Sequence, residues 1–401
     1  MNKKSDAFTR FYDLLQFGEF GGVNPSITDS STYTFLNPDD MTETFLGHSQ
    51  GCFLYSRHWN PSNKYLADAL AALENTESAW VTASGMAAIT CAILQICNSG
   101  DHLITSVTTY GGTYAFLRNY LKKFNIDVSF VDITDHQSVE AEIRPNTKLI
   151  YTESVTNPLL QVSDIPALSG IAKIHGIKLM VDNTFSPLIM TPADLGADFV
   201  VYSLTKFING KNDCVAGAIC GEQRFIDDLT CVNNGTAMLL GPVLDPLRSS
   251  SILKNMHTLH IRLRQHSKNA MFLAERLKEL NLKVIYPGLP EHPQHQLMKK
   301  IMSSEFGFGG MMVLVVDSNK TANRLMKKMQ LEQVGYLAVS LGYFKTLFSC
   351  SGKSTSSEIP EDVQKKIGLS EGLIRFSVGL DNHIENTFNR MKRCLKELKI
   401  I

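Results

Sequence analysis

Short apolar runs alternate with helical patterns through the middle of this 401-residue chain, and this alternation constrains the fold more than any other feature. The runs at 102–106, 127–133, 149–154, 178–182 and 199–203 are β-rich and flanked by polar turns. Such runs suit strands that are buried on both faces of a parallel sheet and joined by right-handed helical crossovers. The pattern therefore predicts an α/β fold with a mostly parallel sheet.

The length of the chain exceeds what one hydrophobic core usually organises, which indicates two domains. From about residue 254 the pattern changes to a long helical segment and two apolar runs, 307–317 and 373–380, with a Ser-rich loop between them. We read this part as a smaller α+β domain packed on the first. The predicted divisions are an arm over 1–61 that contacts a partner subunit, a large cofactor-binding α/β domain over 62–253 and a C-terminal α+β domain over 254–401.

Charge and cysteine usage narrow the class of partner. Lys plus Arg (39) balance Asp plus Glu (39), so no net field attracts nucleic acid or an anionic membrane, and a small molecule is the expected partner. The eight cysteines are scattered without a C-x-x-C pair, which is typical of reduced thiols in a cytosol. Asp13, Gln16 and Glu19 interrupt the apolar residues of the N-terminus, so we expect no signal peptide and a cytoplasmic location.

Polar residues follow two of the predicted strands, where ligands gather in open α/β sheets. Asp182 closes the run 178–182, and Lys206 follows the run 199–203 by three residues, with hydroxyls at Ser203 and Thr205 before it. Pyridoxal 5′-phosphate needs an amine for its aldehyde, a carboxylate for its ring nitrogen and hydroxyl or amide donors for its phosphate. These residues therefore predict a pyridoxal phosphate site.

Several strings, in order from about Gly51 to Leu380, resemble the Cys/Met-metabolism pyridoxal phosphate enzymes. They are YSRHWNP (55–61), ASGMAAI (83–89), TYGGTY (109–114), VDNTFSP (181–187), SLTKFING (203–210) and LIRFSVGL (373–380). Within that family, four more strings resemble the plant-type methionine γ-lyases in particular. They are GCFLYSRH (51–58), HPQH (292–295), AVSLGY (338–343) and SCSGKSTSSE (349–358).

The resemblance implies a type I pyridoxal phosphate fold, like that of aspartate aminotransferase, usually in a homotetramer of two tight dimers. It implies γ-elimination on a sulfur amino acid, with L-methionine giving methanethiol, 2-oxobutyrate and ammonia. Cystathionine γ-lyase, cystathionine γ-synthase and O-acylhomoserine sulfhydrylase remain alternatives, because elimination and replacement share an intermediate. A non-catalytic pyridoxal phosphate-binding regulator is disfavoured, since the residues that carry the chemistry are intact.

By resemblance, Lys206 carries the cofactor and takes the α-proton, Asp182 pairs with the ring nitrogen, and Tyr110 stacks on the ring and protonates the departing sulfur. A helix that begins near Ser84 suits a phosphate at its N-terminus. For the phosphate, the resemblance implies Ser84, Gly85, Met86, Ser203 and Thr205, together with Tyr55 and Arg57 of the neighbouring subunit. For the substrate carboxylate, it implies Arg375, Ser340 and Asn157.

Two positions depart from the family pattern. Gly112 stands where typical bacterial methionine γ-lyases have a cysteine, although plant-type members are also glycine-like there. Lys345 stands where the family mostly has glutamate, and we expect it to repel the distal ammonium of cystathionine and to favour an anionic leaving group such as a succinyl ester. His292 and His295 lack a third ligand at suitable spacing, so we expect a structural loop and no metal site.

Overall fold

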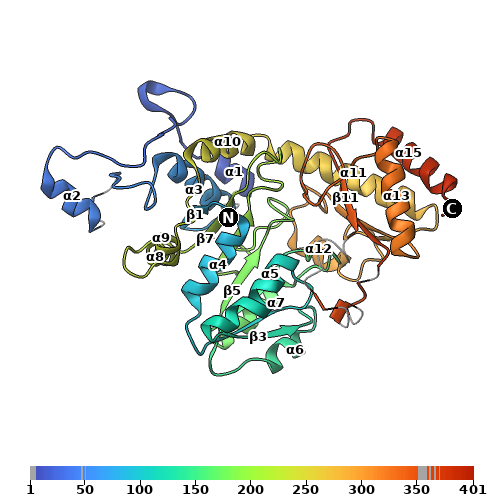
Figure 1. Cartoon of the computed structure of the whole chain (residues 1–401), viewed down its shortest axis with the longest axis horizontal. Helices are drawn as coiled ribbons and strands as arrows, with labels where there is room; N and C mark the ends of the chain where they lie inside the picture. The colour runs from blue at the N-terminus through green and yellow to red at the C-terminus, as the bar shows by residue number, and fades with distance from the viewer. Residues whose placement is uncertain are drawn as a thin grey trace, which may run out of the picture.

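The computed structural model describes residues 6–46, 48–49, 51–350, 359–360, 363–364, 367–369 and 371–401. Within these residues the chain forms a seven-stranded sheet and a five-stranded sheet, each packed against helices (Figure 1). Most of the predicted Ser-rich loop, and with it most of the string 349–358, lies outside the described residues. In the part of the chain that the structure describes, no helix is both long and apolar enough to span a bilayer.

The seven-stranded sheet is mostly parallel, as predicted. Its order is β1-β7-β6-β5-β4-β2-β3, and only β7 runs antiparallel to its neighbours. The strands are β1 (Ser78–Thr82), β2 (His102–Ser106), β3 (Asp127–Val131), β4 (Thr147–Glu153), β5 (Lys178–Asp182), β6 (Phe199–Ser203) and β7 (Gly217–Gly221). The carboxyl ends of β4, β5 and β6 therefore lie side by side at one edge.

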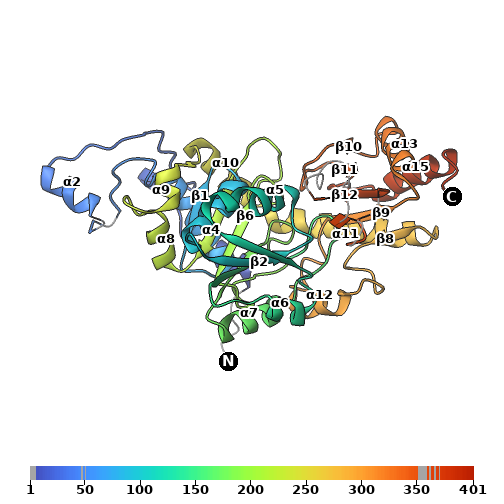
Figure 2. The same cartoon turned by 60° about the horizontal axis from the view of Figure 1, so that its bottom comes forward.

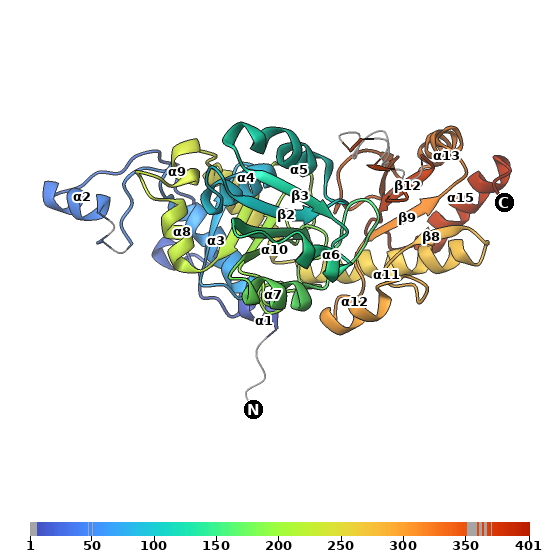
Figure 3. The same ribbon diagram turned by 90° about the horizontal axis from the view of Figure 1, so that it is seen from below.

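Alternate residues of these strands enter two different cores, because successive side chains point to opposite faces of a sheet. Figure 3 shows the sheet between α4 and α5 on one side and α7 and α1 on the other. Tyr151 and Val201 belong to the core on what we call the α4 face, whereas Ile150 and Val200 belong to the core on the α3 face. The helices on the α4 face are α4 (Gly85–Ile96), α5 (Gly111–Ala115), α8 (Gln223–Leu229) and α9 (Thr236–Leu240). The helices on the α3 face are α3 (Pro61–Glu74), α7 (Ile165–Ile174), α10 (Pro246–Met256) and α1 (Ala7–Tyr12).

The C-terminal part forms the second sheet, in the order β10-β11-β12-β9-β8. The long helix α11 (Leu259–Lys278) joins the two parts: Leu259 and Leu263 enter the core on the α3 face, and Leu273 and Leu277 enter the core of the second sheet. The other elements are β8 (Lys283–Ile285), α12 (His295–Ile301), β9 (Met311–Val315), α13 (Asn319–Leu331), β10 (Tyr336–Leu337), β11 (Leu347–Cys350), β12 (Leu373–Ser377) and α15 (Ile384–Glu397).

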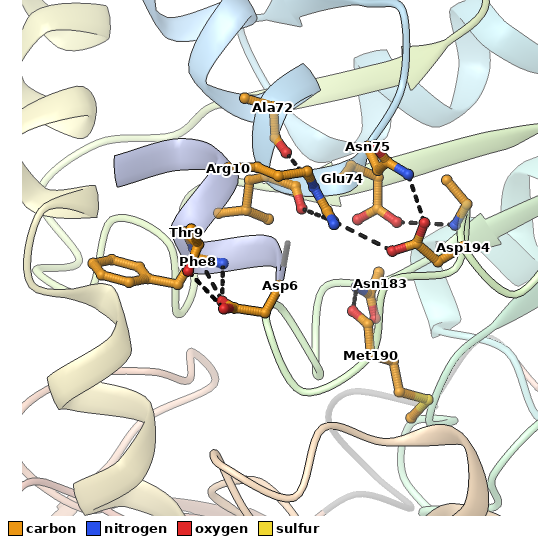
Figure 4. Close-up of polar contacts among 12 residues, drawn as sticks. Asp6, Phe8, Thr9, Arg10, Ala72, Glu74, Asn75, Asn183, Met190 and Asp194 are labelled. Carbon is orange, nitrogen blue, oxygen red and sulfur yellow. Dashed lines mark hydrogen bonds and ion pairs between the residues drawn. The ribbon is translucent and has the colours of Figure 1, made fainter. Parts of the chain in front are cut away.

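The N-terminal segment divides into a docked helix and a projecting arm. Arg10 of α1 donates to the carbonyls of Ala72 and Leu73 at the end of α3 and pairs with Asp194 (Figure 4). Beyond α1 the chain leaves the sheet, and α2 (Pro38–Phe45) lies at the opposite end of the molecule from α15 (Figures 1 and 2). The arm leaves large apolar side chains exposed to solvent, among them Leu15, Phe17, Phe20, Val23 and Leu36.

Candidate active site

A cavity of about 390 Å³ opens at the carboxyl ends of β4, β5 and β6. Ten of the predicted site residues line it, from both sheets and from the N-terminus of α4. They are Ser84, Gly85, Met86, Tyr110, Asn157, Asp182, Ser203, Thr205, Lys206 and Arg375. Residues more than 290 positions apart in the sequence therefore meet in one place, which only the packing of the second sheet against the first achieves.

The first turn of α4 enters the cavity in close contact with β6 and β7. Ser84 is the N-cap, and its hydroxyl accepts a hydrogen bond from the Ala87 N–H at 3.0 Å. A Cβ on Gly85 would lie 2.7 Å from Cβ of Ser203, and a Cβ on Gly217 would lie 2.3 Å from the Ser84 carbonyl oxygen. Glycine is required at both positions for this approach, which leaves a helix N-terminus, a suitable site for a phosphate, facing the cavity.

Lys206 projects into the cavity from the turn that follows β6. Its Nζ lies 3.3 Å from the Ser340 hydroxyl, which donates to Oδ1 of Asn212 at 2.9 Å. Burial, together with the positive charge of Arg375, lowers the pKa of Lys206 to about 8. A larger share of the amine is therefore neutral at physiological pH, and the neutral amine is the form that reacts with a carbonyl.

Asp182 ends β5 and is partly buried. One carboxylate oxygen accepts a hydrogen bond from the Thr184 N–H at 2.9 Å, and the other accepts one from the Tyr151 hydroxyl at 3.4 Å. Burial raises the pKa of Asp182. A cationic partner in the cavity would reverse this effect, because an opposite charge within hydrogen-bond reach favours the ionised form.

Arg375 of β12 is buried with its guanidinium in the cavity. It donates to Oδ1 of Asn157 at 3.0 Å and to the Val339 carbonyl at 3.1 Å. Burial lowers the pKa of Arg375 to about 10, so the group keeps its charge at neutral pH. A buried cation with further N–H donors is suited to bind a carboxylate in two-point fashion.

Tyr110 lies at the start of α5, with its ring partly exposed at the cavity. Its backbone N–H donates to Oε1 of Glu153 at 2.6 Å. A Cβ on Gly112 would lie 2.7 Å from Cε1 of the Tyr110 ring. The glycine that departs from the bacterial pattern therefore leaves room for the tyrosine ring, and any side chain there would displace the ring.

Four residues that the sequence places at the cofactor or the substrate, Tyr55, Arg57, Ser340 and Lys345, do not line the cavity of this chain. Tyr55 pairs with Thr32 in a β-bridge, and Arg57 donates to the Met238 carbonyl at 3.1 Å. Ser340 reaches the cavity only through Lys206. Lys345 lies with its Nζ 4.6 Å from the centroid of the Tyr336 ring, so within one chain it does not face a substrate in the cavity.

Sequence reasoning missed several residues that line the cavity. The missed polar residues are Glu153 and Thr184, and the missed apolar residues are Ile89, Val155, Phe185, Val215, Val339 and Leu341. Glu153 ends β4 as Asp182 ends β5, so the rule that identified Asp182 could also have found it. The apolar residues carry no such signal, because they look like ordinary core residues in the sequence.

The cavity fits pyridoxal phosphate in its chemistry. It combines a neutral-leaning amine, the partly buried carboxylate of Asp182, an aromatic ring and a helix N-terminus. Among the described residues, no group of three His, Cys, Asp or Glu side chains is placed to hold a metal ion. His295 donates from Nδ1 to the Pro287 carbonyl at 2.8 Å and stacks on Phe308.

Comparisons with known proteins agree with this chemistry. The family model described as Cys/Met metabolism PLP-dependent enzyme matches residues 15–396. Methionine gamma-lyase of Arabidopsis thaliana is 44% identical over 384 residues, which cover 94% of this chain and 87% of the relative. Cystathionine gamma-lyase of Dictyostelium discoideum is 36% identical over 363 residues, which cover 88% of this chain and 91% of the relative.

The fold is shared with a solved structure from Campylobacter jejuni, a putative O-acetylhomoserine (thiol)-lyase with N′-pyridoxyl-lysine-5′-monophosphate. It matches with a TM-score of 0.90 and 29% identity, covering 98% of this chain and 100% of that chain. The predicted α/β fold of the type I class is thereby confirmed, and so is the resemblance drawn from the six strings. This chain belongs to the Cys/Met metabolism PLP-dependent enzymes, and pyridoxal phosphate is its cofactor.

Proposed function

We propose that this enzyme is a carbon–sulfur lyase that converts L-methionine and water into methanethiol, 2-oxobutyrate and ammonia. The observation that carries the proposal is the joint lining of one cavity by Lys206, Asp182 and Arg375, in a chain 44% identical to a plant methionine gamma-lyase. The amine, the carboxylate and the guanidinium match three groups of the reaction: the aldehyde of pyridoxal phosphate, its ring nitrogen and the α-carboxylate of the substrate.

The reacting residues are Lys206 and Tyr110. Pyridoxal phosphate, when bound, supplies an aldehyde for the substrate amine and a ring that withdraws electrons from the α-carbon. The lowered pKa of Lys206 favours its neutral amine, which then takes the α-proton as a general base. The hydroxyl of Tyr110 protonates the sulfur as it leaves Cγ.

The other residues bind and orient. Arg375, held by Asn157 and the Val339 carbonyl, binds the substrate α-carboxylate. Asp182 holds the proton on the ring nitrogen, and its hydrogen bonds from Thr184 and Tyr151 keep the carboxylate in place. Ser84, Gly85, Met86, Ser203 and Thr205 hold the phosphate at the N-terminus of α4.

The projecting arm supports an assembly of at least two chains, which we propose is a homotetramer built from two dimers. Tyr55 and Arg57 lie outside their own chain's cavity, and the arm leaves large apolar side chains exposed. A partner subunit would cover this apolar surface and would receive Tyr55 and Arg57 at its phosphate site. We further propose a cytoplasmic location and the divisions 1–61, 62–253 and 254–401 as arm, cofactor-binding domain and C-terminal domain.

A substrate panel tests the proposal against its nearest rivals, cystathionine γ-lyase and the γ-replacement enzymes. The holoenzyme is incubated with L-methionine, with L-cystathionine, and with O-acetyl- or O-succinylhomoserine plus a thiol, and 2-oxobutyrate and the thioether product are measured. We expect methionine to give 2-oxobutyrate and methanethiol with a kcat/KM at least about tenfold above that for cystathionine. Absence of oxoacid from methionine, with turnover of another substrate, would replace this function with the rival one.

A further inference from the structure

Glu153 is a buried carboxylate in the cavity wall that the reaction described above does not use. Its Oε1 accepts hydrogen bonds from the Tyr110 N–H at 2.6 Å and the Thr109 hydroxyl at 3.1 Å. Its Oε2 accepts one from the Asn157 N–H at 2.9 Å. The Glu153 side chain therefore accepts three hydrogen bonds, two from the loop after β2 and one from the loop after β4.

These two loops carry the two parts of the site that contact the cofactor ring and the substrate. Tyr110 presents its ring at the cavity, and Asn157 accepts from the Arg375 guanidinium at 3.0 Å. We propose that Glu153 is a positioning residue that ties Tyr110 and Asn157 together, so that the ring and the carboxylate clamp keep a fixed separation. This inference rests on the proposed function for the roles of Tyr110 and Arg375.

The chemistry of the three donors calls for a carboxylate at this position. A carboxylate offers two acceptor oxygens and no donor, whereas a glutamine would turn an N–H group toward one of the donors. Retaining a carboxyl here is unfavourable by itself, because residue 153 lies directly beside Asp182 in the strand register. Burial and the charge of Asp182 raise the pKa of Glu153, and the three donated hydrogen bonds oppose this shift because they favour the charged carboxylate.

Glu74 provides a matched control on the α3 face. It is also fully buried, burial raises its pKa to about 8, and it accepts from the Ala193 N–H at 3.1 Å and from the Tyr202 hydroxyl (Figure 4 shows its position). It does not line the cavity. A Glu74→Gln variant therefore removes a buried carboxylate without touching the cofactor or substrate residues.

The experiment compares Glu153→Gln with Glu74→Gln as holoenzymes. We expect E153Q to raise the Kd for pyridoxal phosphate and the KM for methionine by about tenfold each, with a smaller change in kcat, and to alter the visible circular dichroism of the bound cofactor. E74Q should leave Kd, KM and kcat within about twofold of wild type and the visible circular dichroism unchanged. Equal effects of the two variants would overturn the inference, because they would reduce Glu153 to a stability role.

Thr109→Val is the second variant, for the case in which E153Q does not fold. It removes one of the three hydrogen bonds to Glu153, and Thr109 itself does not line the cavity. We expect an altered visible circular dichroism and a rise in cofactor Kd of about threefold, and unchanged values of both would contradict the proposal. Neither measurement needs methionine, so a wild-type enzyme inactive on methionine would remove the proposed function and leave the test of Glu153 intact.

Discussion

The two faces of the main sheet each bury a glutamate near the ends of its strands, yet the two carboxyls have different neighbours. On the α4 face, Glu153 binds loops that line the cavity. On the α3 face, Glu74 accepts from the Tyr202 hydroxyl, which in turn accepts from the Asn183 side-chain amide. Asn183 also donates to the Met190 carbonyl (Figure 4). Burial alone therefore does not mark a residue of the site.

The difference between the faces follows from the alternation of side chains along a strand. Asp182 and Asn183 are sequence neighbours, as are Ser203 and Tyr202, but one member of each pair lines the cavity and the other joins the Glu74 network. The α4 face presents reactive groups at the strand ends, and the α3 face supports the same ends from behind. This separation can be tested by changes confined to one face.

The largest expected effect comes from Lys206→Ala, which removes the base from the α4 face. We expect 2-oxobutyrate formation from methionine to fall by at least about 10³-fold, because no other amine lines the cavity within the described residues. Stability against denaturant should change little. Turnover is measured by the oxoacid, and unfolding by circular dichroism in the far ultraviolet.

Lys345→Ala is the matched control for Lys206→Ala, since Lys345 stacks on Tyr336 outside the cavity. Its turnover should stay within about twofold of wild type. If K345A lost activity as K206A does, the lysine would act on a substrate through a route that one chain does not contain, and the comparison of the two faces would need the partner subunit.

The next effect concerns stability and its pH dependence on the α3 face. Burial raises the pKa of Glu74 from 4.5 to about 8 in the folded chain, so between these values the folded state holds a proton that the unfolded state releases. The contribution of Glu74 to stability is therefore complete below about pH 4.5 and is lost as the pH rises through 8. The Glu74→Gln variant has no titrating group at this position. Its free energy of unfolding should therefore rise relative to that of wild type by up to roughly 1 kcal/mol per pH unit between pH 5 and 8.

Denaturant midpoints of wild type and E74Q, taken at half-unit pH steps, measure this difference. Both proteins contain Glu153, so its own titration cancels. Parallel curves would show that Glu74 titrates alike in the folded and unfolded chains.

The smallest effect is expected from Arg10→Ala, at the edge of the α3 face. The variant loses hydrogen bonds to the carbonyls of Ala72 and Leu73 at the C-terminus of α3 and the ion pair with Asp194 (Figure 4). We expect the free energy of unfolding to fall by about 1–2 kcal/mol, with KM unchanged. Arg10→Lys should lower the free energy of unfolding by less than Arg10→Ala does. A raised KM in either variant would mean that α1 influences the cavity.

Much of the fold followed from local pattern, and the structure confirms it. The five predicted runs form β2, β3, β4, β5 and β6, and a helix begins directly after Ser84. These elements were predictable because apolar runs and capping residues act within a few positions of each other. The antiparallel β7 was not predicted, since strand direction depends on pairing with distant strands.

The candidate site shows the same division between what local sequence predicts and what only the tertiary structure decides. The motifs around Asp182 and Lys206 determined the cofactor chemistry, because an amine and a carboxylate after neighbouring strands need only local sequence to be noticed. Only the tertiary structure decided that Glu153 binds Tyr110 and Asn157, that Lys345 stacks outside the cavity, and that Asn157 holds Arg375 from 218 positions away. Tyr110 follows β2 and Glu153 ends β4 of one sheet, and Asn157 and Arg375 come from the two sheets that α11 joins, so no short window of sequence contains both partners of either contact.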